Sequence, residues 1–227
     1  MPSPEENNSF DLLRLVLAVL VVYSHAYNLG GFGDDQGGTI VRQQVPAGSL
    51  AVYGFFGISG FLVTRSFLLR ANWKHFVAAR LLRILPGLYL SLLLTAFLFA
   101  PVISYFNAAS TGWHCADAIG FVVKNALVRI DQWSIGGVLS ALPEPGALNR
   151  ALWSLLPELC CYGLVLVLGL IGSLSLRRAN LLFVLSAVVL LHVALVLFPQ
   201  RENLGPTGSQ LTGWGPCIGA FLMGVVM

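Results

Sequence analysis

Arg14 and His25 lie in the first long apolar run of the chain and are separated by ten uncharged residues, LVLAVLVVYS. Charged and imidazole side chains are unfavourable inside a bilayer and tend to face a protein interior or a wet cavity, so both are candidate functional residues. On a helix, eleven steps of about 100° bring the two side chains to within roughly 20° of one face, about 16 Å apart. Such a stripe can connect a membrane surface to a buried reaction centre.

Each of these two residues also has a purely structural explanation. Asp11 precedes Arg14 by three residues, so the two can pair on one face, and the long arginine side chain can reach the head groups. His25 can serve as a hydrogen-bonding group between helices. Their shared face favours the functional interpretation.

Three further charged residues could carry chemistry. Arg80 and Arg83 lie one turn apart, and their guanidinium groups are suited to a phosphate or a carboxylate, although cytoplasmic helix ends are commonly basic. Glu158 follows Pro157 inside an apolar run. A carboxylate there must be paired with an arginine, protonated or placed in a wet cavity.

Glycines recur every third residue in the segment VYGFFGISGFLVTRSF, at Gly54, Gly57 and Gly60. This spacing predicts a close approach to a neighbouring helix. Ser59 and Thr64 in the same segment could bond their own backbone or line a cavity, and the spacing does not decide between the two.

The composition indicates an all-α protein, a polytopic membrane helix bundle. Of 227 residues, 56% are hydrophobic and only 10% are charged, which leaves no room for a soluble catalytic domain. A net charge of +3 does not indicate nucleic-acid binding. Runs long enough to cross a bilayer predict about six transmembrane helices, at residues 10–29, 49–70, 83–105, 151–173, 180–198 and 211–227.

Basic residues set the expected orientation. The cluster from Arg65 to Arg83 and the pair Arg177 and Arg178 both fall on the cytoplasmic side if the N-terminus is cytoplasmic. Residues 106–150 then form an outer connection, in which the amphipathic stretch AIGFVVKNALVRI, residues 118–130, could lie at the interface or re-enter the membrane.

No metal site is expected from the cysteines. Their spacing fits no ligand pattern, and we interpret them as small packing residues, leaving open a disulfide between Cys115 and Cys217. The four are Cys115, Cys160, Cys161 and Cys217.

Four segments together resemble the bacterial acyltransferase 3 family of integral membrane O-acyltransferases. They are the pair Arg14 and His25, the segment FFGISGFLVTRS around Ser59, the segment RLLRILP with Arg80 and Arg83, and the segment LWSLLPEL with Trp153 and Glu158. Members usually have about ten membrane helices, so we expect residues 1–227 to form a single transmembrane domain of this type that is incomplete.

The resemblance implies a reaction and roles for these residues. An acyl group, commonly acetyl, would pass from cytoplasmic acyl-CoA to a hydroxyl of an envelope or secreted glycan at the bacterial inner membrane, with no permanently bound cofactor. His25 would act as general base, Arg14 would hold the donor phosphate or polarise its carbonyl, and Glu158 would orient His25 or contact sugar. Arg80 and Arg83 would attract the CoA, and Ser59 and Trp153 would contact the acceptor.

Two other functions remain open from the sequence. Arg14, His25 and Glu158 could form a proton or substrate path in a transporter or flippase. The chain also ends at Met227 inside an apolar run, which suggests a catalytically silent, truncated remnant as the third possibility.

Overall fold

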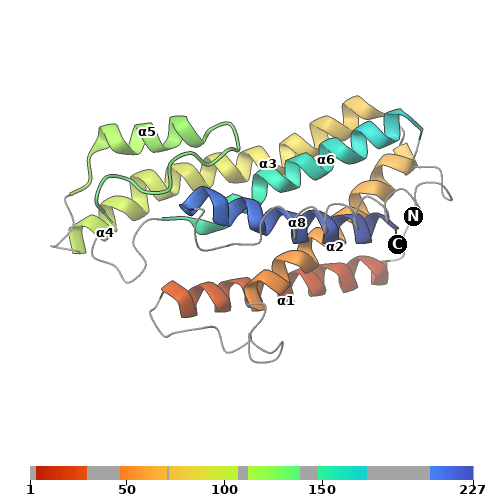
Figure 1. The fold of residues 1–227 in the computed structure, drawn as a ribbon, viewed down its shortest axis with the longest axis horizontal. Helices are drawn as coiled ribbons and strands as arrows, with labels where there is room; N and C mark the ends of the chain where they lie inside the picture. Colours follow the sequence, from red (N-terminus) through yellow and green to blue (C-terminus); the bar gives the residue numbers. More distant parts are fainter. Residues whose placement is uncertain are drawn as a thin grey trace. The chain divides into compact units, whose positions relative to one another are not determined.

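Helices make up most of the part of the chain that the structure describes. The computed structural model describes residues 4–29, 47–70, 72–106, 112–138, 148–172 and 205–226. Because lipid offers no hydrogen-bond partner, an apolar chain in a bilayer pairs its backbone within helices. The helices are α1 (Pro4–Leu29), α2 (Ala47–Arg70), α3 (Trp73–Leu94), α4 (Ala100–Phe106), α5 (Cys115–Asn125), α6 (Leu155–Leu170) and α8 (Gly205–Val226), as Figure 1 shows.

Four of the six expected transmembrane helices are confirmed as long apolar helices. Those candidate spans cover Ser9–Ala26, Ala47–Arg70, Trp73–Phe106 and Ala151–Leu170. The expected span at 180–198 lies outside the described residues. The expected span at 211–227 falls on α8, whose described apolar part, Trp214–Val225, is shorter than the others. The fold class is therefore the predicted helical membrane bundle.

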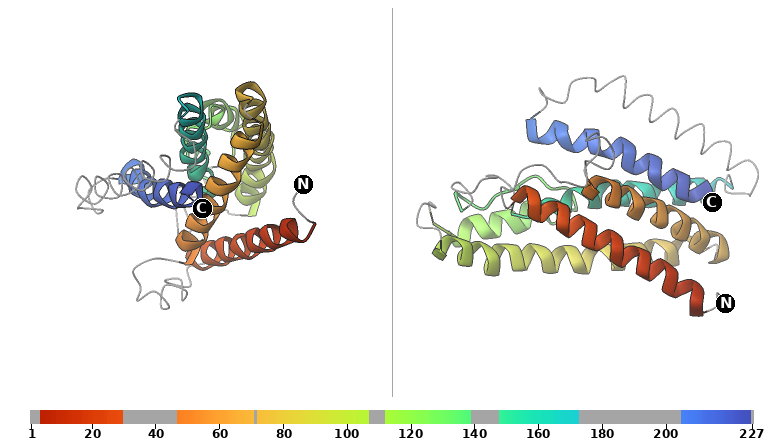
Figure 2. Two further views of the ribbon diagram at one scale, coloured as in Figure 1. Left: turned by 90° about the vertical axis from the view of Figure 1, so that its right-hand side faces the viewer. Right: turned by 90° about the horizontal axis from the view of Figure 1, so that it is seen from below.

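The described helices pack as two compact units. The first comprises Met1–Trp73 with Cys160–Met227, and the second comprises Lys74–Leu159. In the first unit, α2 contacts both α1 and α8 and lies between them in two views (Figures 1 and 2). α2 is thus the central helix of the first unit.

Glycines bring α2 and α8 into close contact, as their spacing predicted. A Cβ atom built on Gly60 would collide with the carbonyl oxygen of Phe221, and one built on Gly224 would collide with the carbonyl oxygen of Gly57. On the α1 side of α2, a Cβ atom on Gly54 would lie 3.0 Å from the side chain of Leu17. Helix backbones approach this closely only where the interface residues are small.

The third span begins earlier than the sequence suggested. We expected it to start at residue 83, whereas α3 begins at Trp73. The first turns carry Lys74, Arg80 and Arg83, which lower the hydropathy without interrupting the helix. Arg80 and Arg83 therefore lie within α3 and not at its start.

A π-helical turn, η2 (Thr95–Phe99), joins α3 to α4. Its widened ring is closed by the backbone N–H of Ala100, which donates to the carbonyl oxygen of Thr95. Pro101 follows directly and has no N–H to donate, so a regular helix would lose one hydrogen bond there and crowd the carbonyl of Phe97. The π turn accommodates this proline.

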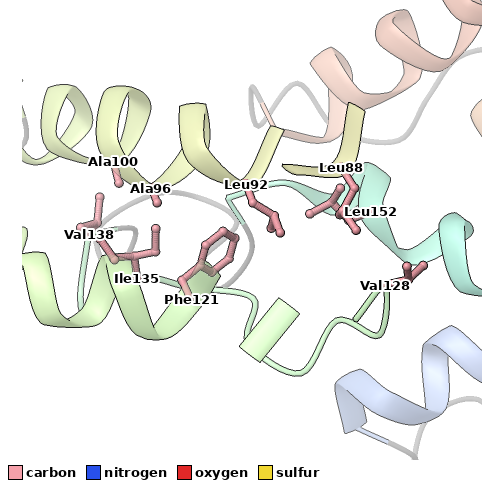
Figure 3. Close-up of a cluster of buried hydrophobic side chains, with 10 residues drawn as sticks. Leu88, Leu92, Ala96, Ala100, Phe121, Val128, Ile135, Val138 and Leu152 are labelled. Carbon is pink, nitrogen blue, oxygen red and sulfur yellow. The ribbon is translucent and has the colours of Figure 1, made fainter. Parts of the chain in front are cut away.

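The core of the second unit lies between this long helix and the segment that follows it. Figure 3 shows Leu92, Ala96 and Ala100 facing Phe121 of α5, with Ile135 and Val138 on the returning chain. The returning chain reverses at Val128, which is buried and has a φ angle of 70°, rare for a β-branched residue.

Asn125, at the last position of α5, stabilises this chain reversal through hydrogen bonds. Its side chain is fully buried, with its Nδ2 donating to the carbonyl oxygen of Gln132 at 2.7 Å. Its Oδ1 accepts the backbone N–H groups of Asp131 and Gln132, each at 3.0 Å. One carboxamide therefore satisfies three backbone groups outside regular structure.

Gly60→Ala is expected to destabilise the first unit, because the added methyl group would collide with the α8 backbone. We expect a loss of about 1 to 3 kcal/mol, measured as a lower midpoint of thermal unfolding in detergent. Gly163→Ala is the matched control, since a Cβ atom there meets nothing within 4 Å. Equal midpoints for the two variants would contradict the close α2–α8 contact.

Asn125→Ala is expected to release the segment after α5. Buried backbone groups left without partners cost about 1 to 3 kcal/mol each, so amide hydrogen exchange at residues 126–138 should rise strongly. Lys124→Ala, at the exposed neighbouring position, should leave exchange unchanged. Unchanged protection in Asn125→Ala would show that the three hydrogen bonds do not hold the segment.

Candidate functional site

Arg14 forms the ion pair with Asp11 that the spacing predicted. The Nη1 atom of Arg14 lies 3.5 Å from Oδ1 of Asp11, and the side chains are 29% and 71% exposed respectively. A long, exposed pair of this kind contributes little stability. Arg14 can therefore exchange Asp11 for another anion at small cost.

His25 has one ring nitrogen occupied by its own helix. Its Nδ1 atom lies 2.9 Å from the carbonyl oxygen of Val21, one turn earlier. A carbonyl oxygen can only accept a hydrogen bond, so Nδ1 carries the proton in this contact. In the neutral imidazole, Nε2 then has a free lone pair, which is the form that a general base requires.

Ser24, next to His25, fits closely against the start of α2. Its side chain is 3% exposed, and a Cβ atom on Gly48 would lie 2.7 Å from its Oγ. The side chain of Ser24 thus packs α1 against α2 next to His25. Sequence reasoning missed Ser24, and its only signal was a small polar residue adjoining a candidate base.

Ser59 is buried in the first unit and has a partner that sequence reasoning also missed. Its Oγ lies 3.4 Å from the hydroxyl oxygen of Tyr162, and both residues are buried. The ring of Tyr162 also packs against that of Phe221, with ring centroids 6.5 Å apart. The available signal was the position of Tyr162 four residues after Glu158, one turn along α6.

Arg80 and Arg83 belong to the second unit and differ in their surroundings. The guanidinium carbon of Arg80 lies 5.4 Å from the centre of the Phe76 ring, a cation–π geometry, and Arg80 is half-buried. Arg83 is exposed. Phe76 thus orients one of the two cations, while the other remains accessible.

Trp153 and Glu158 lie at the start of the fourth span. Trp153 is in a 3-10 turn, η3 (Arg150–Ser154), and Glu158 is in the first turn of α6; both are half-buried. A carboxylate in the first turn of a helix is favoured by the helix dipole. Pro157 is tolerated in the same turn because its missing N–H would have no partner within the helix.

The predicted site residues fall into two groups. Arg14, His25 and Ser59 belong to the first unit, and Arg80, Arg83, Trp153 and Glu158 belong to the second. The structure describes each group within its own unit. The proposed line from donor-binding arginines to base therefore stays a prediction.

The four cysteines are free thiols, so the disulfide left open between Cys115 and Cys217 is not formed. Cys161 and Cys217 are buried, as expected of packing residues, whereas Cys115 and Cys160 are exposed.

The second unit also contains a cavity of about 500 Å³ with neutral polar groups. Ser91, Thr95 and Asn149 contribute these groups, and Nδ2 of Asn149 donates to Oγ of Ser91 at 2.8 Å. The remaining lining is mainly leucine, phenylalanine and isoleucine. The cavity is suited to an uncharged ligand with hydrogen-bonding groups, and no residue predicted from the sequence lines it.

Two curated proteins are similar to this chain. An O-acetyl transferase of Shigella phage Sf6 is 32% identical over 163 residues, which cover 69% of this chain and 44% of the relative. Nodulation protein 10 of Rhizobium leguminosarum bv. viciae is 42% identical over 91 residues, which cover 40% of this chain and 24% of the relative. The chain thus spans less than half the length of these relatives.

No solved structure matches the chain. The acyltransferase domain that defines the acyltransferase 3 family matches residues 7–227, which is nearly all of the sequence. The match includes all four segments on which the resemblance rested. The chain belongs to the acyltransferase 3 family.

Proposed function

We propose that the chain provides the catalytic membrane helices of an O-acyltransferase. In this proposal an acyl group, acetyl in the first instance, passes from acyl-CoA at the cytoplasmic face of a bacterial inner membrane to a hydroxyl of an envelope or secreted glycan. Family membership and the similarity to a phage O-acetyl transferase support the reaction class. The outer connections between helices, such as residues 106–150, would select the acceptor glycan.

The hydrogen bond from His25 to Val21 carries this proposal. With Nδ1 donating to the backbone, Nε2 is available to take a proton. As the acceptor hydroxyl oxygen attacks the thioester carbonyl carbon, Nε2 takes the hydroxyl proton. The carbon–sulfur bond then breaks, and the imidazolium returns the proton to the leaving thiolate, which gives the ester and free CoA.

The arginines would bind and neutralise the negative charge of the acyl-CoA donor. Arg14 is paired only by a long, exposed contact with Asp11, so a phosphate or a developing oxyanion can replace that partner. Arg83, exposed midway along α3, and Arg80, oriented by Phe76, would attract the CoA phosphates. Ser59, Trp153 and Glu158 remain proposed acceptor contacts.

His25→Ala is expected to lower acyl transfer by about 10²- to 10⁴-fold, the usual contribution of a general base. Transfer is measured as incorporation of label from radioactive acetyl-CoA into the glycan of membranes that carry the full-length protein. His114→Ala, which removes an exposed histidine, is the control and should keep wild-type activity. Normal activity of a stably inserted His25→Ala protein would refute the proposed base.

Arg83→Ala is expected to raise KM for acetyl-CoA by about 10- to 100-fold with little change in kcat, because one charge-assisted contact contributes about 1.5 to 3 kcal/mol. Higher salt should reduce the difference between variant and wild type. Arg65→Ala, an exposed arginine on α2, is the control for net charge. An equal rise in KM for both variants would argue against a specific CoA contact at Arg83.

A further inference from the structure

The long helix formed by α3, η2 and α4 indicates how deep the residues packed along it lie in the membrane. Charged residues end at Arg83, and residues 84–106 contain none. Large apolar side chains remain exposed as far as Phe106, which is 80% exposed. These 23 residues measure about 34 Å at 1.5 Å per residue, close to the thickness of the hydrocarbon layer, about 30 Å. The apolar segment thus runs from a basic end at Arg83 to the Phe106 end.

Residues 113–138 lie along this apolar segment. The indole Nε1 of Trp113 donates to the carbonyl oxygen of Ala96 at 2.9 Å. Figure 3 shows Phe121 beside Leu92, Val128 at the Leu88 end of the cluster, and Val138 back at the Ala100 end. The segment therefore runs from the Phe106 half of the long helix toward its basic end and returns.

The outer surface of α5 and of the turn that follows it is divided into an apolar and a polar stripe. Ile119, Val123 and Leu127 succeed one another at intervals of four residues and are 51%, 67% and 86% exposed. Lys124 lies about 100° and Asp117 about 120° around the helix from the centre of that stripe. Three exposed β-branched or leucine side chains in a row are unfavourable in water and favourable against lipid.

Side chains provide hydrogen bonds to several backbone groups in the non-helical part of the segment. Asn125 satisfies backbone groups of Asp131 and Gln132, and Nε2 of Gln132 donates to the carbonyl oxygen of Ser134 at 2.8 Å. Irregular backbone is tolerated inside a bilayer only where partners of this kind, or a wet cavity, replace water.

The turn of the segment carries its own ion pair, between Arg129 and Asp131 at 2.8 Å. Both side chains are substantially exposed, at 74% and 48%. The turn that contains Arg129 lies at the Leu88 end of the long helix (Figure 3). Leu88 is five residues from Arg83, or about 8 Å along the helix. Exposed charges at that level can reach the head groups, which they could not do near the middle of the layer.

We propose that residues 113–138 form a re-entrant hairpin that enters the bilayer from the Phe106 end of the long helix. Ile119, Val123 and Leu127 contact lipid acyl chains, and the turn at Arg129 and Asp131 lies at the basic end beside Arg83. The hairpin is thus a membrane-embedded element that does not cross the bilayer. This inference is independent of the proposed acyl transfer.

The lipid contact is tested by fluorescence in full-length protein whose native cysteines are replaced by alanine. Val123→Cys and Lys124→Cys are each labelled with bimane and reconstituted into phosphatidylethanolamine and phosphatidylglycerol vesicles. Doxyl groups on the acyl chains should quench the label at position 123 and leave the label at position 124 much brighter. Quenching of position 123 by aqueous iodide, or by neither reagent, would overturn the lipid contact.

The depth of the turn is tested with a membrane-impermeant maleimide. In the same background, Asn72→Cys marks the basic face and Phe106→Cys marks the opposite face. Arg129→Cys should react from the face at which position 72 reacts, and Asp131→Cys provides a second variant if Arg129→Cys accumulates poorly. Reaction from the face of position 106, or from neither face, would refute the re-entrant path.

Discussion

The structure depends on one constraint: in a hydrocarbon layer, the chain must satisfy its own backbone hydrogen bonds. Long apolar helices follow directly, as does the use of glycine where two helices meet without a hydrophobic driving force, at Gly60 and Gly224. The same constraint explains Asn125. Where the helix ends, a single buried carboxamide replaces the partners that a further helical turn would have provided.

The constraint also affects the candidate site. His25 uses the second lone pair of a carbonyl oxygen in its own helix, so its ring is oriented without a second ionisable group. Ser59 and Tyr162 instead satisfy each other across two helices. The first arrangement leaves a ring nitrogen available for chemistry, while the second is a buried contact between side chains that holds the helices in register.

Local patterns in the sequence predicted much of this fold. Apolar runs located α1, α2 and α6, and the glycine spacing located the close contact of α2 with a neighbouring helix. The spacing of Asp11 and Arg14 identified their ion pair. These features could be predicted because each depends on residues close together in the sequence. The early start of α3 was missed, since hydropathy falls where a helix carries basic residues. Tyr162 was missed because its partner is 103 residues away, and no local pattern encodes such a pairing.

The π turn at Thr95–Phe99 has a consequence for how this helix tolerates change. A π turn contains one residue more than the α-helical turn it replaces and absorbs that residue locally, so the helix on either side stays in phase. Leu92 before the turn and Ala100 after it therefore both face the core. Deletion of a single residue there would keep this common face, but it would return Pro101 to a regular turn, where its ring crowds a preceding carbonyl. The extra residue thus lets one proline enter the helix without turning its apolar face.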